Sequence, residues 1–171
     1  LAISMTHDLN AWVRGAAIEI LGDLGDGASG NLIRPHLESP DRAVRYAAAG
    51  ALFKLGDRSE LSILLGGLKG GNSTDRYQAI GYLGKIGTAE VIPYLEGLLD
   101  GDEDEIVFYS LKAIGENVDK GILPQLIRLT RHHNPSLRYQ SALILGELRG
   151  VSGLETLRSL CSDKDPMVRL S

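Results

Sequence analysis

The sequence predicts an all-α repeat array of about five helical hairpins, and three observations lead to this prediction. One pattern, anchored mostly on arginine, recurs every 31 residues without an insertion. In most copies, a helix-start signal lies four residues before the anchor. In the first three copies, a helix-ending glycine lies eleven residues after it. Between these glycines and the next helix start, leucine and isoleucine recur at helical spacing. The anchors are Arg14, Arg45, Arg76, Val107, Arg138 and Arg169.

The helix boundaries follow from capping chemistry. Asn or Asp before a helix can cap its free N–H groups, and proline fits the first turn, as at Asn134-Pro135 and Asp165-Pro166. Gly25, Gly56 and Gly87 stand where a helix needs a left-handed residue to end. The residues that stand four positions before the six anchors are Asn10, Asp41, Asn72, Glu103, Asn134 and Asp165.

We expect residues 1–171 to form a single array, as a fragment of a longer one that continues with further repeats at one or both ends. Residue 1 falls inside one expected helix, and residue 171 falls one turn into another. The helices are expected near residues 11–22, 28–38, 42–55, 59–69, 73–86, 90–99, 104–117, 121–132, 135–148 and 152–162.

The second helix of each repeat has an apolar stripe that one repeat cannot bury alone. In residues 42–55 the stripe consists of Val44, Ala48, Ala51, Leu52 and Leu55. Three residues after each of the first five anchors stands alanine or serine, which lets neighbouring helices approach closely. Stacking of repeats would bury the stripes as a continuous core.

The second-helix pattern D-x-x-V-R-x-A-A-x-x-L-G-x-L-G and the helical pairs resemble HEAT repeats, most closely the phycobilisome-lyase HEAT-like repeat. The resemblance implies a right-handed α-α superhelix. It also implies a hydrogen-bond ladder between the capping residues and the arginines of successive repeats. Repeat four departs from the pattern, with Val107 for arginine and Glu103 for the usual cap, and should interrupt the ladder. The arginines with this structural role are Arg14, Arg45, Arg76, Arg138 and Arg169.

Composition limits the functional classes. The net charge of −4 argues against a general nucleic-acid binder, which must neutralise phosphates. The single cysteine, Cys161, cannot form a disulfide within the chain and is expected in the core. The sequence has no apolar run long enough to cross a membrane. We expect a cytoplasmic protein without a nucleic-acid or membrane partner.

The aromatic residues gather in one column, directly after the anchors. The second helix of each repeat resembles the helix that lines the concave face of HEAT arrays. We therefore expect this column to form an aromatic ladder on the concave face. The rings either contact a ligand or lean onto the next repeat, and both arrangements stay open. Rings one repeat apart would meet about every third residue of an extended peptide. The predicted partner-binding residues are Trp12, Tyr46, Tyr77, Phe108, Tyr109, Tyr139 and Lys112.

No arrangement of residues predicts a catalytic centre, a metal or a cofactor. His132 and His133 fit an exposed basic helix end, and a metal site would need further ligands that converge on them. The acidic run 100–105 lacks the ligand spacing of a calcium loop. The absence of a His-Glu dipeptide disfavours a metal-dependent HEAT hydroxylase.

The function favoured by the sequence is a non-catalytic scaffold that binds a protein or an extended peptide through the aromatic ladder. A phycobilin lyase subunit or domain, acting on an antenna protein, is the enzyme that the resemblance leaves open. A HEAT-fold DNA-binding protein or glycosylase is disfavoured by the acidic charge and the single Trp12.

Overall fold

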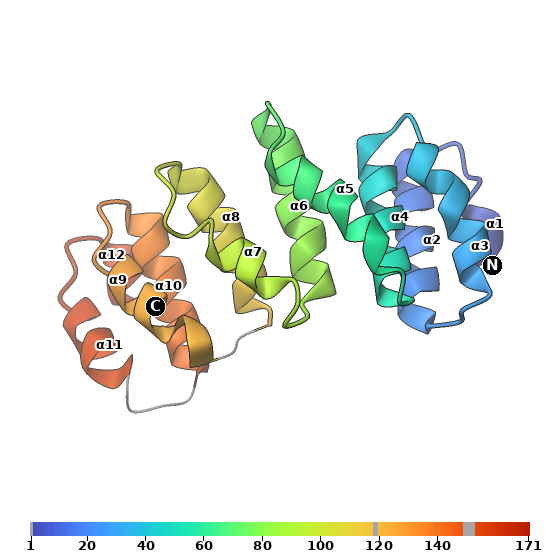
Figure 1. Cartoon of the computed structure of the whole chain (residues 1–171). Helices are drawn as coiled ribbons and strands as arrows, with labels where there is room; N and C mark the ends of the chain where they lie inside the picture. The colour runs from blue at the N-terminus through green and yellow to red at the C-terminus, as the bar shows by residue number, and fades with distance from the viewer. Residues whose placement is uncertain (1, 118–119, 149–152) are drawn as a thin grey trace. The chain divides into compact units, whose positions relative to one another are not determined.

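The computed structural model describes residues 2–117, 120–148 and 153–171, and this part of the chain contains helices and no strand. The chain folds into two compact units, Leu1–Ile86 and Gly87–Ser171, here called unit 1 and unit 2. In each unit, longer helices alternate with shorter helical segments (Figure 1). The helices agree with the all-α fold class expected from the sequence.

In unit 1 the second helices of the repeats are long and the first helices short or broken. The first helix expected over 28–38 changes to 3-10 geometry at Arg34, directly before Pro35, which has no N–H to donate to the preceding turn. The elements are α1 (Ala2–Met5), α2 (Ala11–Leu24), α3 (Ser29–Ile33), η1 (Arg34–Glu38), α4 (Arg42–Lys54), η2 (Arg58–Glu60), α5 (Leu61–Leu68) and α6 (Ser73–Ile86).

Unit 2 repeats this alternation. Within the expected range 90–99, the α-helix covers only Ile92–Glu96 and has Pro93 in its first turn. The elements are α7 (Ile92–Glu96), α8 (Asp104–Gly115), η3 (Lys120–Ile122), α9 (Leu123–Leu129), α10 (Pro135–Glu147), α11 (Leu154–Leu160) and α12 (Pro166–Arg169).

The predicted caps are present at five of the six repeat positions. The side chains of Asn10, Asp41, Asn72, Asn134 and Asp165 each accept a hydrogen bond from a backbone N–H in the first turn. Before α8, Glu103 makes no side-chain cap bond. Gly25, Gly56 and Gly87 have φ of 70°, 102° and 61°, so the predicted left-handed residues after α2, α4 and α6 are confirmed.

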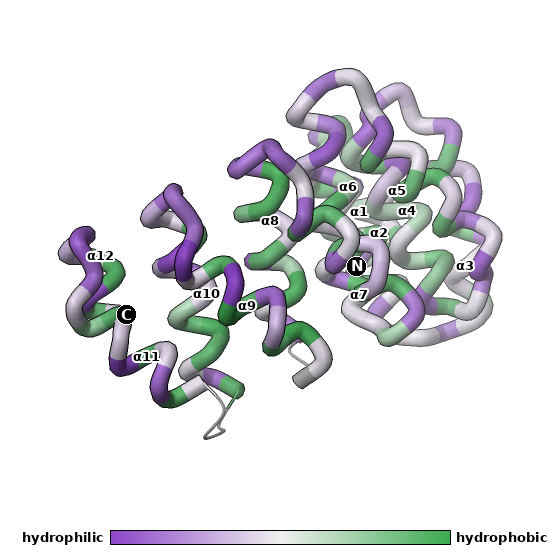
Figure 2. The backbone as a smooth tube through the Cα atoms, turned by 60° about the vertical axis from the view of Figure 1, so that its left-hand side comes forward, coloured by the Kyte–Doolittle hydropathy of each residue, from purple (hydrophilic) through white to green (hydrophobic). Residues whose placement is uncertain are grey.

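The core of unit 1 is centred on the contact between α2 and α4. Ile18 and Leu21 of α2 pack with Val44, Ala48 and Leu52 of α4, and all five side chains are buried. In Figure 2 the helices carry green apolar stretches, whereas the turns that lead into α8 and α10 are mostly purple. Each unit therefore buries the stripe predicted from the 31-residue pattern.

Close packing depends on small residues at this contact. A methyl group on Gly22 would lie 2.7 Å from the Cα of Ala51, so the backbones of α2 and α4 approach closely there. Because backbone cannot move aside as a flexible side chain can, position 22 has room only for glycine.

The anchor arginines clamp the turn that precedes their own helix. The Nη1 of Arg14 donates to the carbonyl oxygens of Asp8 and Leu9, at 2.9 and 3.0 Å. Arg45 and Arg169 make the same pair of bonds to the residues six and five positions earlier. The expected ladder between caps and arginines is therefore wrong for these residues, since they bind backbone within one repeat and not the next cap.

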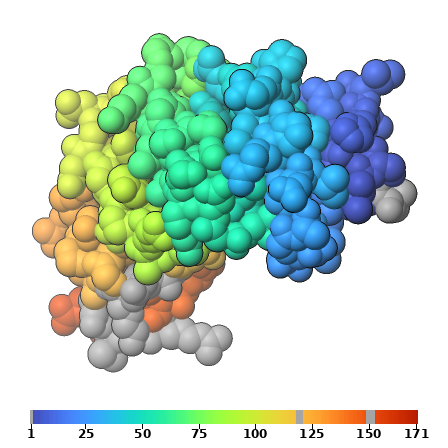
Figure 3. Space-filling view, turned by 45° about the vertical axis from the view of Figure 1, so that its right-hand side comes forward, coloured from blue at the N-terminus to red at the C-terminus, as the bar shows by residue number. Residues whose placement is uncertain are grey.

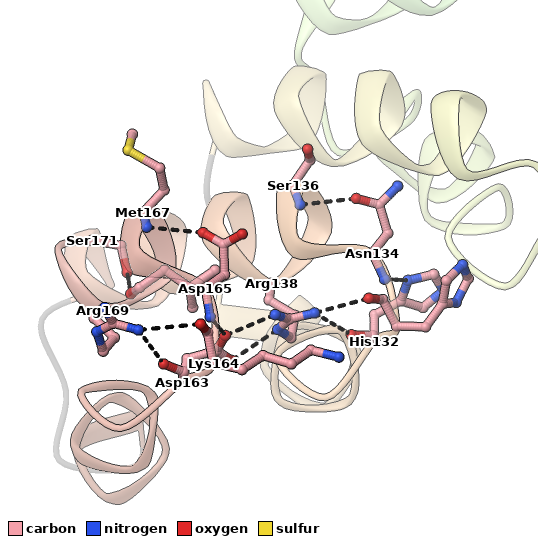
Figure 4. Close-up of polar contacts among 12 residues, drawn as sticks. His132, Asn134, Ser136, Arg138, Asp163, Lys164, Asp165, Met167, Arg169 and Ser171 are labelled. Carbon is pink, nitrogen blue, oxygen red and sulfur yellow. Dashed lines mark hydrogen bonds and ion pairs between the residues drawn. The ribbon is translucent and has the colours of Figure 1, made fainter.

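Arg138 makes the same clamp and also reaches the following repeat. Its Nη1 donates to the carbonyls of His132 and His133, and its Nε and Nη2 donate to the two oxygens of Asp163 at 2.8 and 2.7 Å (Figure 4). The Arg138 side chain is only 5% exposed. This bidentate pair holds the pKa of Asp163 at about 2, mainly through the hydrogen bonds from Arg138. At the matching position of repeat four, Val107 is buried and cannot make a clamp.

Gly67, in the last turn of α5, provides space for a buried ring. A methyl group at this position would collide with the hydroxyl of Tyr46 and lie 2.8 Å from the Cβ of Ala79. A methyl group on the neighbouring Gly66 would meet no atom within 4 Å. The two glycines are thus adjacent in sequence but differ in what they contact.

Gly67→Ala should lower the free energy of unfolding by about 2 kcal/mol, because the cost of overpacking exceeds the gain in helix propensity. Gly66→Ala is the matched control and should raise it by about 0.5–1 kcal/mol. Urea denaturation followed by circular dichroism measures both changes. Equal effects of the two substitutions would contradict the packing of Tyr46 under α5.

The Arg138–Asp163 pair should stabilise the protein in a pH-dependent manner. The pKa of Asp163 is lowered from about 4 to about 2, so its contribution is complete above pH 4 and is lost as the pH falls towards 2. We expect Asp163→Asn to lower the free energy of unfolding by about 2 kcal/mol at pH 7 and by little near pH 2.

Urea denaturation of wild type and variant across this pH range measures the difference. Glu147→Gln, which removes an exposed carboxylate of α10, is the control and should show little dependence. A difference between wild type and Asp163→Asn that stays constant from pH 7 to 2 would refute the role of the ion pair.

Candidate functional site

The predicted aromatic column is divided between the two units. Trp12, Tyr46 and Tyr77 lie in unit 1, on α2, α4 and α6. Phe108, Tyr109 and Lys112 of α8 and Tyr139 of α10 lie in unit 2. The two sets have different surroundings, and each is considered within its own unit.

In unit 1 Tyr46 has the second of the two arrangements left open, because its ring leans onto the next repeat and is not available as the predicted partner-binding residue. The side chain is 4% exposed, its hydroxyl lies against Gly67, and its ring meets that of Tyr82 edge to face at 6.3 Å. Gly50, four residues after Tyr46, lies next to Ile86 and Tyr82 of α6. The burial follows because glycine in α5 leaves a space that a tyrosine ring can fill.

Residues of α6 cover the surface that α2 and α4 form near Gly15 and Gly50. Tyr82 lies over Gly15 and Gly50, and Lys85 pairs with Glu19 of α2 at 2.8 Å. Burial and the nearby Glu19 carboxylate raise the pKa of the Tyr82 hydroxyl, so it stays protonated. The cavity that remains beside Tyr82 and Lys85 measures about 20 Å³, enough for about one water molecule. It has no room for a larger ligand.

The other two predicted residues of unit 1 have separate environments. Trp12, in the first turn of α2, is 89% exposed, and Tyr77 of α6 is half-buried. In the space-filling view of Figure 3, the blue-to-green segments of this unit form a closed surface on the face shown. Unit 1 therefore offers an isolated tryptophan and not the expected ladder.

Unit 2 keeps more of the predicted surface available. Tyr109 is 42% exposed, Lys112 is exposed, and Phe108 and Tyr139 are half-buried. Leu143 of α10, four residues after Tyr139, is 37% exposed. Because α8 and α10 are packing neighbours, these side chains come from adjacent helices. We call this set the unit 2 strip, and it consists of Phe108, Tyr109, Lys112, Tyr139 and Leu143.

The rings of the strip are held in place by their neighbours. Phe108 and Tyr109 meet edge to face with centroids 5.7 Å apart. Tyr139 packs against a buried cluster that includes Leu160 and Val168. Leu143 was not predicted as a site residue, although an exposed leucine one turn beyond the aromatic column was a usable signal.

A groove of about 360 Å³ lies beside Leu143, between α10, α11 and α12. Leu157, Leu160 and Val168 line it, and Cys161 stands at its edge. Cys161 is exposed, so the expectation that it belongs to the core is wrong.

His132 and His133 precede α10 and lie close to Asp104, the first residue of α8. The sequence did not suggest this neighbour, since 28 residues separate Asp104 from His132. Burial lowers the pKa of His132, so its imidazole is neutral at pH 7.

No described helix combines the length and hydrophobicity that crossing a membrane requires.

Comparison with protein families gives two matches. The family described as HEAT repeats matches residues 1–76 and 108–171. The PBS lyase HEAT-like repeat matches residues 75–101. Comparison with curated proteins gives no match.

Several solved structures resemble the chain over 99% of its length. The complex of CpcE and CpcF of phycocyanin lyase from Nostoc sp. PCC7120 is 25% identical, with a TM-score of 0.51 over 72% of that chain. Human deoxyhypusine hydroxylase is 18% identical, with a TM-score of 0.51 over 80% of that chain. The Escherichia coli protein YibA is 16% identical, with a TM-score of 0.61 over 66% of that chain. The last two likenesses concern the fold alone.

The repeat period, the helical pairs, the capping residues and the family matches agree. The HEAT-repeat matches together span most of the chain, and the lyase-type repeat covers part of the segment between them. The chain belongs to the HEAT-repeat family.

Proposed function

We propose that this protein is a non-catalytic scaffold that binds an extended segment of a partner protein through the unit 2 strip. The observation that carries the proposal is the exposure of Tyr109 and Leu143 beside the half-buried rings of Phe108 and Tyr139. HEAT repeats in general mediate protein interactions, which supports this class of function.

The strip has the physical properties of a binding surface. Partly buried rings offer apolar area and lose little side-chain entropy on binding, because their neighbours already hold them. The exposed Lys112 adds a positive charge that an acidic side chain or a backbone carbonyl of the ligand could meet. We therefore expect a ligand with spaced apolar side chains and an acceptor between them.

The spacing of the helices favours an extended ligand. Packed helices lie about 8–10 Å apart, and an extended chain advances about 3.3 Å per residue. Side chains three residues apart on such a ligand would therefore reach α8 and α10 in turn.

Peptides selected from a random displayed library against the wild-type chain should lose affinity when the strip is changed. The double substitution Tyr109→Ser and Leu143→Ser removes the most exposed apolar contacts and should weaken binding at least about tenfold. Fluorescence anisotropy with the selected peptides measures the dissociation constants. Tyr46 is left unchanged, since its removal would open the core of unit 1.

Tyr94→Ser is the matched control, because Tyr94 is a tyrosine of the same unit with a similar exposure of 45% and lies on α7. It should leave binding unchanged. Equal loss for Tyr94→Ser and the double variant, or equal affinity of wild type and double variant, would place the binding surface elsewhere.

A phycobilin lyase subunit is a second candidate function. The likeness to the phycocyanin lyase complex at 25% identity and the lyase-type repeat at residues 75–101 favour it. In this case the rings of the unit 2 strip would contact a linear tetrapyrrole in place of a peptide.

Mixing the chain with a free bilin distinguishes the two candidates. A lyase subunit should retain the bilin on gel filtration, with visible absorbance at the protein peak. A scaffold for peptides should elute without that absorbance, and this result would exclude bilin binding by the chain alone.

A further inference from the structure

One cluster of side chains outside the strip brings together three potential metal ligands from two successive repeats. Asp104 begins α8, and His132 and His133 lie in the turn before α10. One ligand atom from each residue lies within 4.8 Å of the others. The Nε2 of His133 is 3.1 Å from one oxygen of Asp104, and the Nε2 of His132 is 3.8 Å from the other.

From this geometry we propose that Asp104, His132 and His133 bind a divalent transition-metal ion of the Zn²⁺ class. Two imidazoles and one carboxylate form a ligand set suited to this ion, and water would complete a tetrahedron. Imidazole is a poor ligand for Mg²⁺ and Ca²⁺, which bind oxygen, so the donor atoms select against these hard cations.

The surrounding contacts hold the ligands close together without a metal. Arg138 donates to the backbone carbonyls of His132 and His133 at 3.0 and 2.9 Å, and Asp163 fixes its guanidinium. The Nδ2 of Asn134 donates to the Asp104 carboxylate at 2.8 Å. Hydrogen bonds to the residues that carry the ligands orient those ligands and strengthen metal sites. A loose encounter of surface side chains would not have these supports.

The hydrogen bonding of His132 limits the affinity of the site. Its Nδ1 accepts a hydrogen bond from the backbone N–H of Asn134 at 3.2 Å, which places the proton of a neutral ring on Nε2. Coordination through Nε2 must move that proton and give up this bond, at a cost of about tenfold in affinity. We therefore expect micromolar affinity.

The position of the cluster gives the ion a structural consequence. Repeat four has Val107 in place of the clamping arginine and lacks a side-chain cap bond at Glu103. A bound ion would join the start of α8 to the turn before α10, next to the position where repeat four departs from the pattern. Metal binding should thus stabilise unit 2.

Isothermal titration calorimetry of the full chain with Zn²⁺ tests the proposal. Wild type should bind one ion with micromolar affinity, and His133→Gln should bind at least about tenfold more weakly. His133 is 78% exposed, so this substitution should leave the fold intact. Asp104→Asn keeps an acceptor for Asn134 but loses the charge, and it should weaken binding to a similar extent.

Two control variants separate this site from adventitious binding. Asp102→Asn removes an exposed carboxylate of the same turn, and His7→Ala removes an exposed imidazole of unit 1. Both should bind Zn²⁺ as wild type does. Failure of wild type to bind at about 100 μM Zn²⁺, well above the expected micromolar dissociation constant, would overturn the proposal, as would equal binding by His133→Gln.

Thermal unfolding gives an independent readout. At a Zn²⁺ concentration about one hundred times the dissociation constant, the midpoint for wild type should rise by about 5 °C, and EDTA should reverse the rise. His133→Gln binds at least about tenfold more weakly, so its midpoint should rise by no more than about half as much under the same conditions. An equal rise in wild type and this variant would contradict the assignment.

Discussion

The close approach of successive second helices is the constraint on which the rest of unit 1 depends. At Gly22 the backbones of α2 and α4 come so near that a methyl group would lie 2.7 Å from the Cα of Ala51. This approach lets α6 reach across α4, so that Lys85 pairs with Glu19 two repeats away. Gly15 and Gly50 lie beside Tyr82 of α6, at the same contact between the three helices. The fixed period of 31 residues keeps these small positions in register.

Features that depend on local chemistry could be predicted from the sequence, and features that depend on a neighbour's backbone could not. The cap at Asn134 and the left-handed Gly87 are set within a few residues of chain. The partners of Arg14 and Arg45 are backbone carbonyls, which any residue has, so no side-chain pattern marks them. Arg138 gains a carboxylate because the next repeat has Asp163 where the repeat after Arg45 has Gly70. That difference was visible in the sequence, but its meaning required the contact.

The candidate site shows the same division between features that the local sequence predicts and features that a neighbouring repeat decides. The aromatic column was correctly located on the second helices, but the period alone cannot say whether a ring is exposed. Tyr46 is buried because Gly67 of α5 leaves space for its ring. The two adjacent glycines of α5 were the feature of the sequence from which this burial could have been predicted. In unit 2, Tyr109 and Leu143 remain exposed, and no neighbouring first helix in the described part of the chain covers them as α5 covers Tyr46. Exposure is thus set by residues outside the repeat that carries the ring.

Departures from the repeat pattern, more than the pattern itself, distinguish one surface of this protein from another. The position five residues after the anchor is Glu19, Gly50 or Gly81 in unit 1, and it is Lys112 or Leu143 in unit 2, where both residues are exposed. Repeat four loses its arginine clamp at Val107, and Asp104 turns to residues of the next repeat. The regular residues stack the helices, whereas the irregular ones are free to acquire a ligand. Lys112 and Leu143 of the strip and Asp104 of the proposed metal site stand at such irregular positions.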